Sequence, residues 1–230
     1  MIKSVLITGG AGNLGKAVCE RFLEAGWKVT AVIGPNDETG FIRHEKLYAE
    51  RIDLFGGPDA ESALRELIKK NGPFSFSVLT VGGFGMGGFR QTSLEDLRKM
   101  FRLNFETAYT TSGVLCEHFM AAGLPGRIVL FGARPGLDLR YAGEMVAYGL
   151  SKSLVIHLAE IINVTGQGKN IDAAVIIPSI IDTPANRKAM PDADFAKWVL
   201  PDAIADNIYF LSTESGREQR NVILKMYGNS

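Results

Sequence analysis

Tyr148 and Lys152 stand four residues apart in the stretch Tyr148-Gly-Leu-Ser-Lys152. On an α-helix, residues at this spacing lie on one face, so the phenol and the ammonium are expected to point the same way. A phenol has an ordinary pKa near ~10, and a nearby cation lowers that pKa because it stabilises the phenolate. The pair therefore predicts a tyrosine that exchanges protons near neutral pH. Taken alone, the spacing also fits an ordinary surface tyrosine and lysine.

A glycine-rich loop near the start of the chain is a second candidate site. It follows an apolar strand expected over 2–8 and precedes a helix expected from about 16 to 25. Glycines let the backbone turn tightly and approach a pyrophosphate, whose charge the free N–H groups at a helix start stabilise. This context favours dinucleotide binding over a tight turn without a ligand. The candidate residues of the loop are Thr8, Gly9, Gly12, Asn13, Leu14 and Gly15.

Strands and helices alternate along the rest of the chain. A strand, a helix and a further strand form a right-handed βαβ unit with parallel strands. The pattern predicts a single-domain Rossmann-type α/β fold over 1–230, a doubly wound parallel sheet with helices on both faces. Further strands are expected near 29–33, 47–54, 74–81, 127–131, 171–177 and 222–226. Helices are expected over 58–70, 93–122, from the region of Tyr148 to about 164, and 202–212, with 179–200 as a loop containing short helices.

Composition restricts the possible partners. The 25 Lys and Arg residues balance the 25 Asp and Glu residues, which argues against nucleic acid or an anionic membrane as a partner. No apolar run approaches the ~18 residues that a membrane span needs. The two cysteines predict buried thiols rather than a disulfide, and the three histidines show no metal-ligand spacing. We expect a soluble, cytoplasmic protein that binds no metal.

Three motifs in this order resemble the short-chain dehydrogenase/reductase family. They are Thr8-Gly9 near the start, Tyr148-x-x-x-Lys152 on a late helix, and Pro178 followed by Ile181-Asp-Thr183. The resemblance covers the whole chain and implies an NAD(P)-dependent oxidoreductase. It implies that Tyr148 donates a proton, while Lys152 lowers the pKa of Tyr148 and hydrogen-bonds the nicotinamide ribose. In this family the usual second glycine stands where this chain has Asn13, so a slightly different but still competent loop is expected.

The same resemblance assigns roles to several other residues. Asn104 matches the asparagine that holds a water in the proton relay, although it could also cap nearby backbone. Asp53 matches an acid that contacts the adenine, and a plain turn aspartate is almost as good an interpretation. Ile181 and Thr183, after Pro178, match the grip on the nicotinamide carboxamide, and Thr183 could instead cap the following segment. The loop glycines Gly82 and Gly83 belong with the cofactor-binding set.

The second half resembles more narrowly the dihydropteridine reductase branch of that family. The stretches that carry this resemblance are Gly132-Ala133-Arg134 and the run from Asp182 to Phe195 in the segment 179–200, which normally covers the substrate. Most of the family has a serine at Ala133 to hold the substrate carbonyl oxygen, and loss of such a donor costs ~10²-fold or more in rate. The branch shares the alanine, and its quinonoid dihydropterin is already an activated acceptor.

The resemblance therefore implies reduction of a quinonoid dihydropterin or a similar activated heterocycle. Two alternatives stay open. One is a reductase of an unrelated carbonyl compound or quinone, against which the missing serine counts in the case of simple ketones. The other is a non-catalytic NAD(P)-binding sensor, although such proteins commonly lose the tyrosine or lysine that this chain retains.

Cofactor choice depends on the end of the second strand. NAD-specific relatives have an acid there that binds the ribose 2′-hydroxyl, and this chain has Ile33 followed by Gly34. Asp37 lies beyond the turn, and Arg43 could reach a 2′-phosphate. These residues favour NADP(H) over NAD(H) by a small margin.

The family also implies a homodimer or homotetramer, built through the long helix and the helix that carries Tyr148. Val114, Leu115, Leu154 and Val155 supply apolar surface for such an interface, and the same pattern fits plain burial in the core.

Overall fold

The computed structural model describes residues 2–229, so residues 1 and 230 of the expected domain lie outside the described residues. Across the described residues, parallel strands form a seven-stranded sheet in the order β3-β2-β1-β4-β5-β6-β7. The predicted doubly wound parallel sheet is confirmed. Its strands are β1 (Ser4–Thr8), β2 (Lys28–Ile33), β3 (Leu47–Arg51), β4 (Phe76–Leu79), β5 (Gly126–Phe131), β6 (Ile171–Pro178) and β7 (Ile223–Met226).

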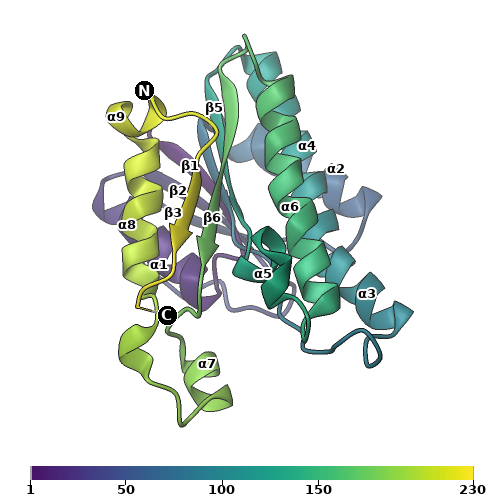
Figure 1. The fold of residues 1–230 in the computed structure, drawn as a ribbon. Helices are drawn as coiled ribbons and strands as arrows, with labels where there is room; N and C mark the ends of the chain where they lie inside the picture. Colours follow the sequence, from purple (N-terminus) through teal and green to yellow (C-terminus); the bar gives the residue numbers. More distant parts are fainter. Residues whose placement is uncertain (1, 230) are drawn as a thin grey trace.

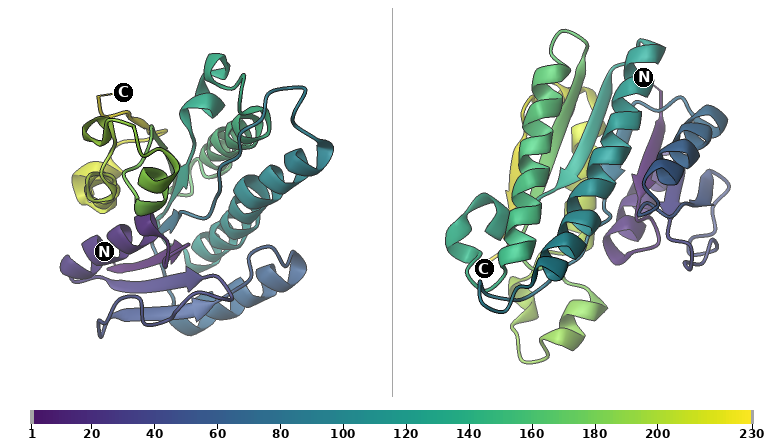
Figure 2. Two further views of the ribbon diagram at one scale, coloured as in Figure 1. Left: turned by 90° about the horizontal axis from the view of Figure 1, so that it is seen from below. Right: turned by 90° about the vertical axis from the view of Figure 1, so that its right-hand side faces the viewer.

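Helices cover both faces of the sheet (Figures 1 and 2). On one face, α1 (Asn13–Glu24) and α8 (Pro201–Ser212) enclose an apolar core that contains Phe22 and Ile208. On the other face, α2 (Pro58–Asn71), α4 (Thr107–Ala122) and α6 (Val146–Thr165) enclose a second core. The shorter helical segments are α3 (Leu94–Phe101), η1 (Arg102–Glu106), α5 (Arg134–Leu137), η2 (Leu139–Tyr141), α7 (Pro184–Ala189), η3 (Phe195–Lys197) and α9 (Glu214–Arg217).

The carboxyl ends of the strands meet at one edge of the sheet because the strands are parallel. The short helices α5 and α7 lie at this end of the molecule (Figure 1). The strand order reverses direction between β1 and β4, which makes the first loop, after β1, part of the crevice where ligands bind in such sheets. The fold therefore assembles the glycine loop, the loop after β4 and the start of α6 at one edge.

Several predicted boundaries were wrong. Strands β3 and β4 are shorter than expected, and α1 begins at Asn13 rather than near Lys16. The helix expected over 93–122 is not one α-helix: a capping box at Ser93 starts α3, a π-helical turn follows over Arg102–Glu106, and α4 continues after it. A π turn inserts one extra residue into the helical repeat, commonly at functional sites. Here it contains Asn104.

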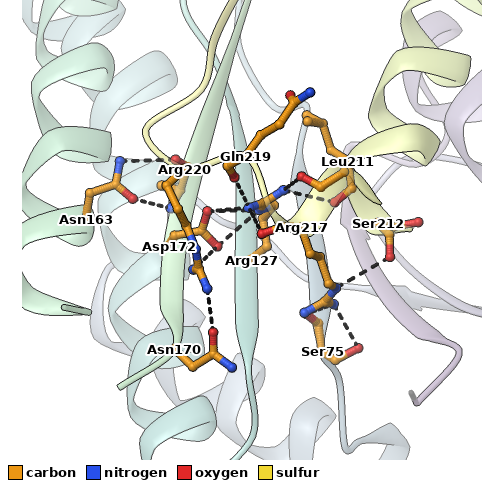
Figure 3. A network of polar contacts seen from close by, with 12 residues as sticks. Ser75, Arg127, Asn163, Asn170, Asp172, Leu211, Ser212, Arg217, Gln219 and Arg220 are labelled. Carbon is orange, nitrogen blue, oxygen red and sulfur yellow. Dashed lines mark hydrogen bonds and ion pairs between the residues drawn. The ribbon is translucent and has the colours of Figure 1, made fainter. Parts of the chain in front are cut away.

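A buried ion pair binds the amino ends of the strands to the C-terminal part of the chain (Figure 3). The Arg127 side chain, only 1% exposed, donates from Nη2 to Oδ2 of Asp172 at 2.7 Å. Its Nη1 also donates to the carbonyl oxygens of Leu211 at 3.0 Å and Gly216 at 2.8 Å. Arg220 contacts the second Asp172 oxygen at 3.3 Å. The network fastens α8, α9 and the approach to β7 against β5 and β6.

Asn163 of α6 completes the edge of β6 where β7 has not yet begun. Strand β7 pairs with β6 only from Val175 onward. Two residues earlier, the Ala173 N–H donates to Oδ1 of Asn163 at 2.7 Å, and Nδ2 of Asn163 donates to the Ala173 carbonyl at 3.1 Å. The carboxamide thus takes the place of a neighbouring strand's peptide group, because buried backbone groups need partners.

Two further sequence expectations concern cysteines and membranes. Cys19 is buried, Cys116 is half-buried, and both are free thiols, as predicted. Among residues 2–229, no helix combines the length and the apolar character that crossing a membrane requires.

Candidate active site

The glycine loop leaves the start of α1 open to an anion. Gly12 is the N-cap residue and has no side chain to bind the first N–H groups of the helix, and the first turn contains no acidic residue. A Cβ atom at Gly15 would lie 2.1 Å from the Gly9 carbonyl oxygen, so the close approach of helix and loop requires glycine there. Asn13 simply begins the helix. Unsatisfied N–H groups without a competing carboxylate fit a pyrophosphate.

The loop is fastened to β4 beside it. The Thr8 carbonyl, at the end of β1, accepts hydrogen bonds from the Thr80 hydroxyl at 2.7 Å and from the Thr80 N–H at 3.3 Å. Leu14 packs against the core on the α1 side. Thr80 was not among the predicted site residues, because nothing in its sequence context distinguishes it from an ordinary strand threonine.

Asn104 links three segments of the site. Its Oδ1 accepts the Gly83 N–H at 2.9 Å, and its Nδ2 donates to the Gly83 carbonyl at 3.1 Å and to the Ser151 hydroxyl at 3.0 Å. The side chain is 1% exposed. Asn104 thus caps backbone that is near it in space, in the loop after β4, and also bonds to helix α6; its role toward a relay water stays a prediction. Ser151, which donates onward to the Tyr148 carbonyl at 2.8 Å, was missed.

Gly82 lies against both Asn104 and Lys152. A Cβ atom at Gly82 would lie 2.7 Å from Oδ1 of Asn104 and 3.1 Å from Nζ of Lys152. Any larger residue would therefore push these two side chains apart. The structure thus brings together Asn104, Lys152 and the Gly82–Gly83 loop, as the sequence predicted for members of one site.

Lys152 and Tyr148 both lie on α6, but their electrostatics differ from the expectation. Nζ of Lys152 donates to the Phe131 carbonyl at the end of β5, 2.9 Å away, and burial lowers the pKa of Lys152 to about 8. Burial raises the pKa of Tyr148 to about 12. In this structure the expected lowering of the Tyr148 pKa is not seen, because the ammonium is bound to a backbone carbonyl and the phenol is desolvated; the role of Lys152 toward Tyr148 during the reaction stays a prediction.

Phe84 packs against the half-buried phenol ring of Tyr148. The two ring centres are 5.1 Å apart with an interplanar angle of 74°, an edge-to-face contact. Phe84 itself is 60% exposed. Phe84 was not among the predicted site residues; a large aromatic group in an otherwise glycine-rich loop is the sequence signal that could have indicated it.

The remaining predicted positions adopt local structural roles. The Asp53 carboxylate accepts the Phe55 N–H at 3.0 Å, which is the turn role. Thr183 caps α7 by accepting the Asn186 N–H at 3.2 Å, so the capping alternative is confirmed. Pro178 ends β6, and Ile181 forms a β-bridge with Val199. These contacts hold the 179–200 segment, which contains the expected short helices, at the carboxyl ends of the strands; the roles toward a cofactor stay predictions.

Ala133 is buried, 4% exposed, immediately before α5. Its methyl group offers no hydrogen-bond donor. Within residues 2–229, no group of three or more His, Cys, Asp or Glu side chains is arranged to hold a metal ion.

At the end of β2, Asp37 lies closer to the strand than its position beyond the turn in the sequence indicated. The Gly34 N–H donates to Oδ2 of Asp37 at 2.8 Å, so the turn folds this carboxylate back to the end of the strand. Arg51, which pairs with Ile33 across β2 and β3, donates from Nη2 to the Asp37 carbonyl at 2.8 Å. An acid and a guanidinium therefore both lie at the position where relatives select the cofactor. Arg43 is exposed.

Comparison with known proteins decides the family. The family described as short chain dehydrogenase matches residues 3–194. The chain belongs to the short-chain dehydrogenase family. As a member of this family it is an oxidoreductase, and the open start of α1 fits the NAD(P) cofactor of the family.

The chain is similar to proteins with quite different names. Dihydropteridine reductase of Dictyostelium discoideum is 26% identical, covering 96% of this chain and 92% of that protein. The cyclic-di-GMP-binding biofilm dispersal mediator protein of Escherichia coli is 28% identical, covering 84% of this chain and 78% of that one. The solved structure of ElxO with NADP bound superposes with a TM-score of 0.89 at 24% identity, covering 99% and 98% of the two chains.

Four residues of the two long helices were predicted to supply apolar surface for an interface between subunits. Val114, Leu115 and Val155 are buried in the core that α4 and α6 share, with at most 4% exposure, so for these the core interpretation is correct. Leu154 is half-buried.

Proposed function

We propose that this protein is an NAD(P)H-dependent reductase of a quinonoid dihydropterin or a similar activated planar heterocycle. The observation that carries the proposal is Ala133. A buried methyl group after β5 cannot polarise a substrate carbonyl, so the site suits an acceptor that needs no such help. The extent of similarity to a protein named dihydropteridine reductase, 96% of this chain, supports the same substrate class.

The cofactor is held by backbone more than by charge in this proposal. When bound, the reduced nicotinamide supplies the hydride. The first loop and the start of α1 bind the pyrophosphate, Asp53 contacts the adenine, and Lys152 binds the nicotinamide ribose. The residues after β6 orient the carboxamide. The proposed cofactor-binding set is Thr8, Gly9, Gly12, Asn13, Leu14, Gly15, Asp53, Gly82, Gly83, Lys152, Pro178, Ile181 and Thr183.

Tyr148 donates the proton that the acceptor requires in addition to the hydride. A pKa of about 12 keeps its phenol protonated at neutral pH, which is the state a donor needs. Transfer of that proton is assisted when Lys152, a cation below a pKa of about 8, stabilises the phenolate that forms. In this role the Lys152 ammonium gives up its hydrogen bond to the Phe131 carbonyl. Asn104 holds the neighbouring loop and the water of the relay.

Phe84 supports a planar substrate. Its exposed ring lies edge-to-face with Tyr148, so the ring borders the position from which the phenol can reach a ligand. Aromatic groups bind flat heterocycles through offset-stacked or edge contacts. The 179–200 segment then covers the substrate from the side of β6.

NADP(H) is proposed over NAD(H), by a small margin. The Arg51 guanidinium beside the turn after β2 supplies the positive charge that a 2′-phosphate needs, and arginine is well suited to phosphate. The Asp37 carboxylate at Gly34 favours the free 2′-hydroxyl of NAD(H) instead. We also propose a homodimer or homotetramer in the cytoplasm.

The decisive test compares the wild-type protein with Tyr148→Phe on a substrate panel that includes quinonoid dihydropterin, ketones and quinones, followed by NAD(P)H absorbance. The proposal expects turnover of the pterin and a fall of about 10²-fold or more in the variant, with cofactor affinity nearly unchanged. Turnover by Tyr148→Phe equal to that of the wild type would contradict the role of Tyr148 as proton donor. A preference for ketones or quinones would show that the substrate belongs to that class instead of the dihydropterins.

A second candidate is a non-catalytic NAD(P)-binding sensor, favoured by the similarity to the biofilm dispersal mediator. It is supported if the protein binds NAD(P)H in calorimetry but oxidises it with no compound of the panel.

A further inference from the structure

A cavity of about 670 Å³ lies outside the glycine-loop crevice, at the carboxyl ends of β5 and β7. Its lining is polar and aromatic and includes Arg134, Asp138, Arg140, Tyr141, Lys225 and Tyr227. We propose that this cavity binds the anionic group, a carboxylate or a phosphate, of a small molecule. The cavity contributes nothing to the roles assigned above to Tyr148, Lys152 or Asn104.

The Arg134 guanidinium is held in a fixed orientation inside the cavity. Its central carbon lies 4.0 Å from the centre of the Tyr141 ring and 4.9 Å from the centre of the Tyr227 ring. Nη2 also donates to the Tyr141 hydroxyl at 2.6 Å. Two aromatic contacts and a hydrogen bond remove the rotamer freedom that an arginine normally loses on binding, so the planar fork is preorganised for a second, anionic partner.

The charge balance of the cavity is positive. Asp138 is neutralised by Arg140, whose Nη2 donates to its Oδ2 at 2.6 Å and whose Nε donates to its Oδ1 at 2.9 Å. The positive charges of Arg134 and Lys225 remain in addition to this pair. Within residues 2–229, neither Lys225 nor Arg134 forms an ion pair, although the charge of Arg134 also acts on Asp138. Three cations therefore share one carboxylate on this concave surface. Such a surface attracts an anion that bridges Arg134 and Lys225.

The position of the cavity connects it with the substrate side of the fold. Arg134 follows Ala133 directly, and the Tyr227 carbonyl accepts the Ser179 hydroxyl at 2.8 Å where the 179–200 segment begins. Lys225 pairs across the sheet with Ile177, next to Pro178. An anion here is therefore either the acidic end of the substrate itself or a separate ligand beside it.

Calorimetric titration of the wild-type protein with inorganic phosphate, and separately with malonate, tests the site at constant ionic strength in chloride buffer. We expect saturable binding of at least one anion. Lys225→Gln, on an exposed strand position, removes one charge and is expected to weaken binding about tenfold. Arg134→Lys keeps the charge but loses the fork, and a similar loss is expected. Lys69→Gln, on the exposed side of α2, removes a charge elsewhere and is expected to bind as the wild type does.

No saturable binding, or equal affinity in all four proteins, would overturn the proposal. The titration needs no turnover, so its result is independent of the proposed reductase activity. Where turnover is observed, phosphate that raises KM without changing kcat assigns the anionic group to the substrate, and phosphate that leaves KM unchanged assigns it to a separate ligand.

Discussion

The carboxamide of Asn104 and the backbone of Gly83 exchange two hydrogen bonds, one in each direction, at 2.9 and 3.1 Å. Asn104 lies in the π-helical turn between α3 and α4, and Gly83 lies in the loop after β4. An asparagine is intrinsically unfavourable in a helix interior, and the extra residue of a π turn distorts the helix further. These two bonds offset that cost and fix the loop that carries Gly82 and Phe84.

Asn104→Ala should therefore release this loop. The change leaves the Gly83 peptide groups and the Ser151 hydroxyl without their partner, so we expect a loss of about 1–3 kcal/mol in the free energy of unfolding, measured by urea denaturation. Turnover should fall about tenfold or more because the loop also borders Tyr148. Asn207→Ala, whose Nδ2 donates to the Ala203 carbonyl within its own helix α8, is the matched control and should change both quantities little. Wild-type turnover in Asn104→Ala would contradict the role.

Lys152 should impose a falling limb on the pH profile of activity. Its pKa is lowered to about 8 by burial, so the cation is present below that pH and is lost as pH rises through it. We expect kcat/KM of the free enzyme to fall above pH about 8. Lys152→Arg keeps its charge at every accessible pH, and its falling limb should move upward even if its maximum is lower. If the fall in activity occurred at the same pH in that variant, a group other than Lys152 would cause it.

The same group predicts a trend in stability. Between the folded pKa of about 8 and the ordinary value of 10.5, the unfolded chain holds the proton and the folded chain does not. Stability therefore gains a contribution that rises with pH across this window. Comparison of chemical denaturation curves for wild type and Lys152→Met should show that this contribution is absent from the variant.

Gly15→Ala should weaken cofactor binding. The added Cβ atom would lie 2.1 Å from the Gly9 carbonyl, which forces the loop away from the start of α1. We expect at least about tenfold weaker NADPH binding by fluorescence titration, since the N–H groups at the helix start lose their alignment. Gly40→Ala, which meets open space, is the control. Circular dichroism of both variants separates loss of binding from loss of folding.

Arg51 and Asp37 should act in opposite directions on cofactor choice. Arg51→Gln removes the guanidinium beside the turn and is expected to raise KM for NADPH about tenfold while changing KM for NADH little. Asp37→Asn removes the carboxylate charge at Gly34 and should lower KM for NADPH relative to NADH. Steady-state kinetics with both cofactors measures the two ratios. A wild-type enzyme that strongly prefers NADH would reverse the cofactor proposal.

Arg127→Met should be strongly destabilising without affecting the chemistry directly. The variant leaves Asp172 buried, with the half-exposed Arg220 as its remaining ion-pair contact within residues 2–229, and removal of one partner of a buried pair costs about 3–5 kcal/mol. Guanidinium denaturation measures the loss. Arg127→Met combined with Asp172→Leu should recover part of it, because the uncompensated carboxylate is gone; no recovery would mean that the bonds to Leu211 and Gly216 dominate instead.

Local patterns were enough to predict much of the fold. The apolar runs of β1 and β2, the glycine loop and the helix after it are each specified by neighbouring residues, so their order and the parallel sheet could be predicted. Tyr148 and Lys152 could be placed on one helix for the same reason. Strand β3 was extended too far because its residues are only partly buried and carry a weak pattern.

The electrostatics of the site could not be predicted in the same way. Lys152 binds the Phe131 carbonyl because α6 packs beside the end of β5, a relationship between residues far apart in the sequence. The π turn depends on the distant Gly83, and the return of Asp37 to Gly34 depends on how one turn closes. Sequence spacing identifies which residues are available, whereas tertiary packing decides what each polar atom contacts.

The Asn163 carboxamide also affects how one molecule of the protein can interact with another. An unpaired peptide group on an outer strand is a template for the strands of other molecules, and chains in a crowded solution aggregate through such contacts. Because Asn163 occupies both hydrogen-bonding groups of Ala173, the portion of β6 that precedes β7 offers no such template at that residue. A single side chain on a helix thereby limits self-association at this residue, a property on which selection can act independently of catalysis.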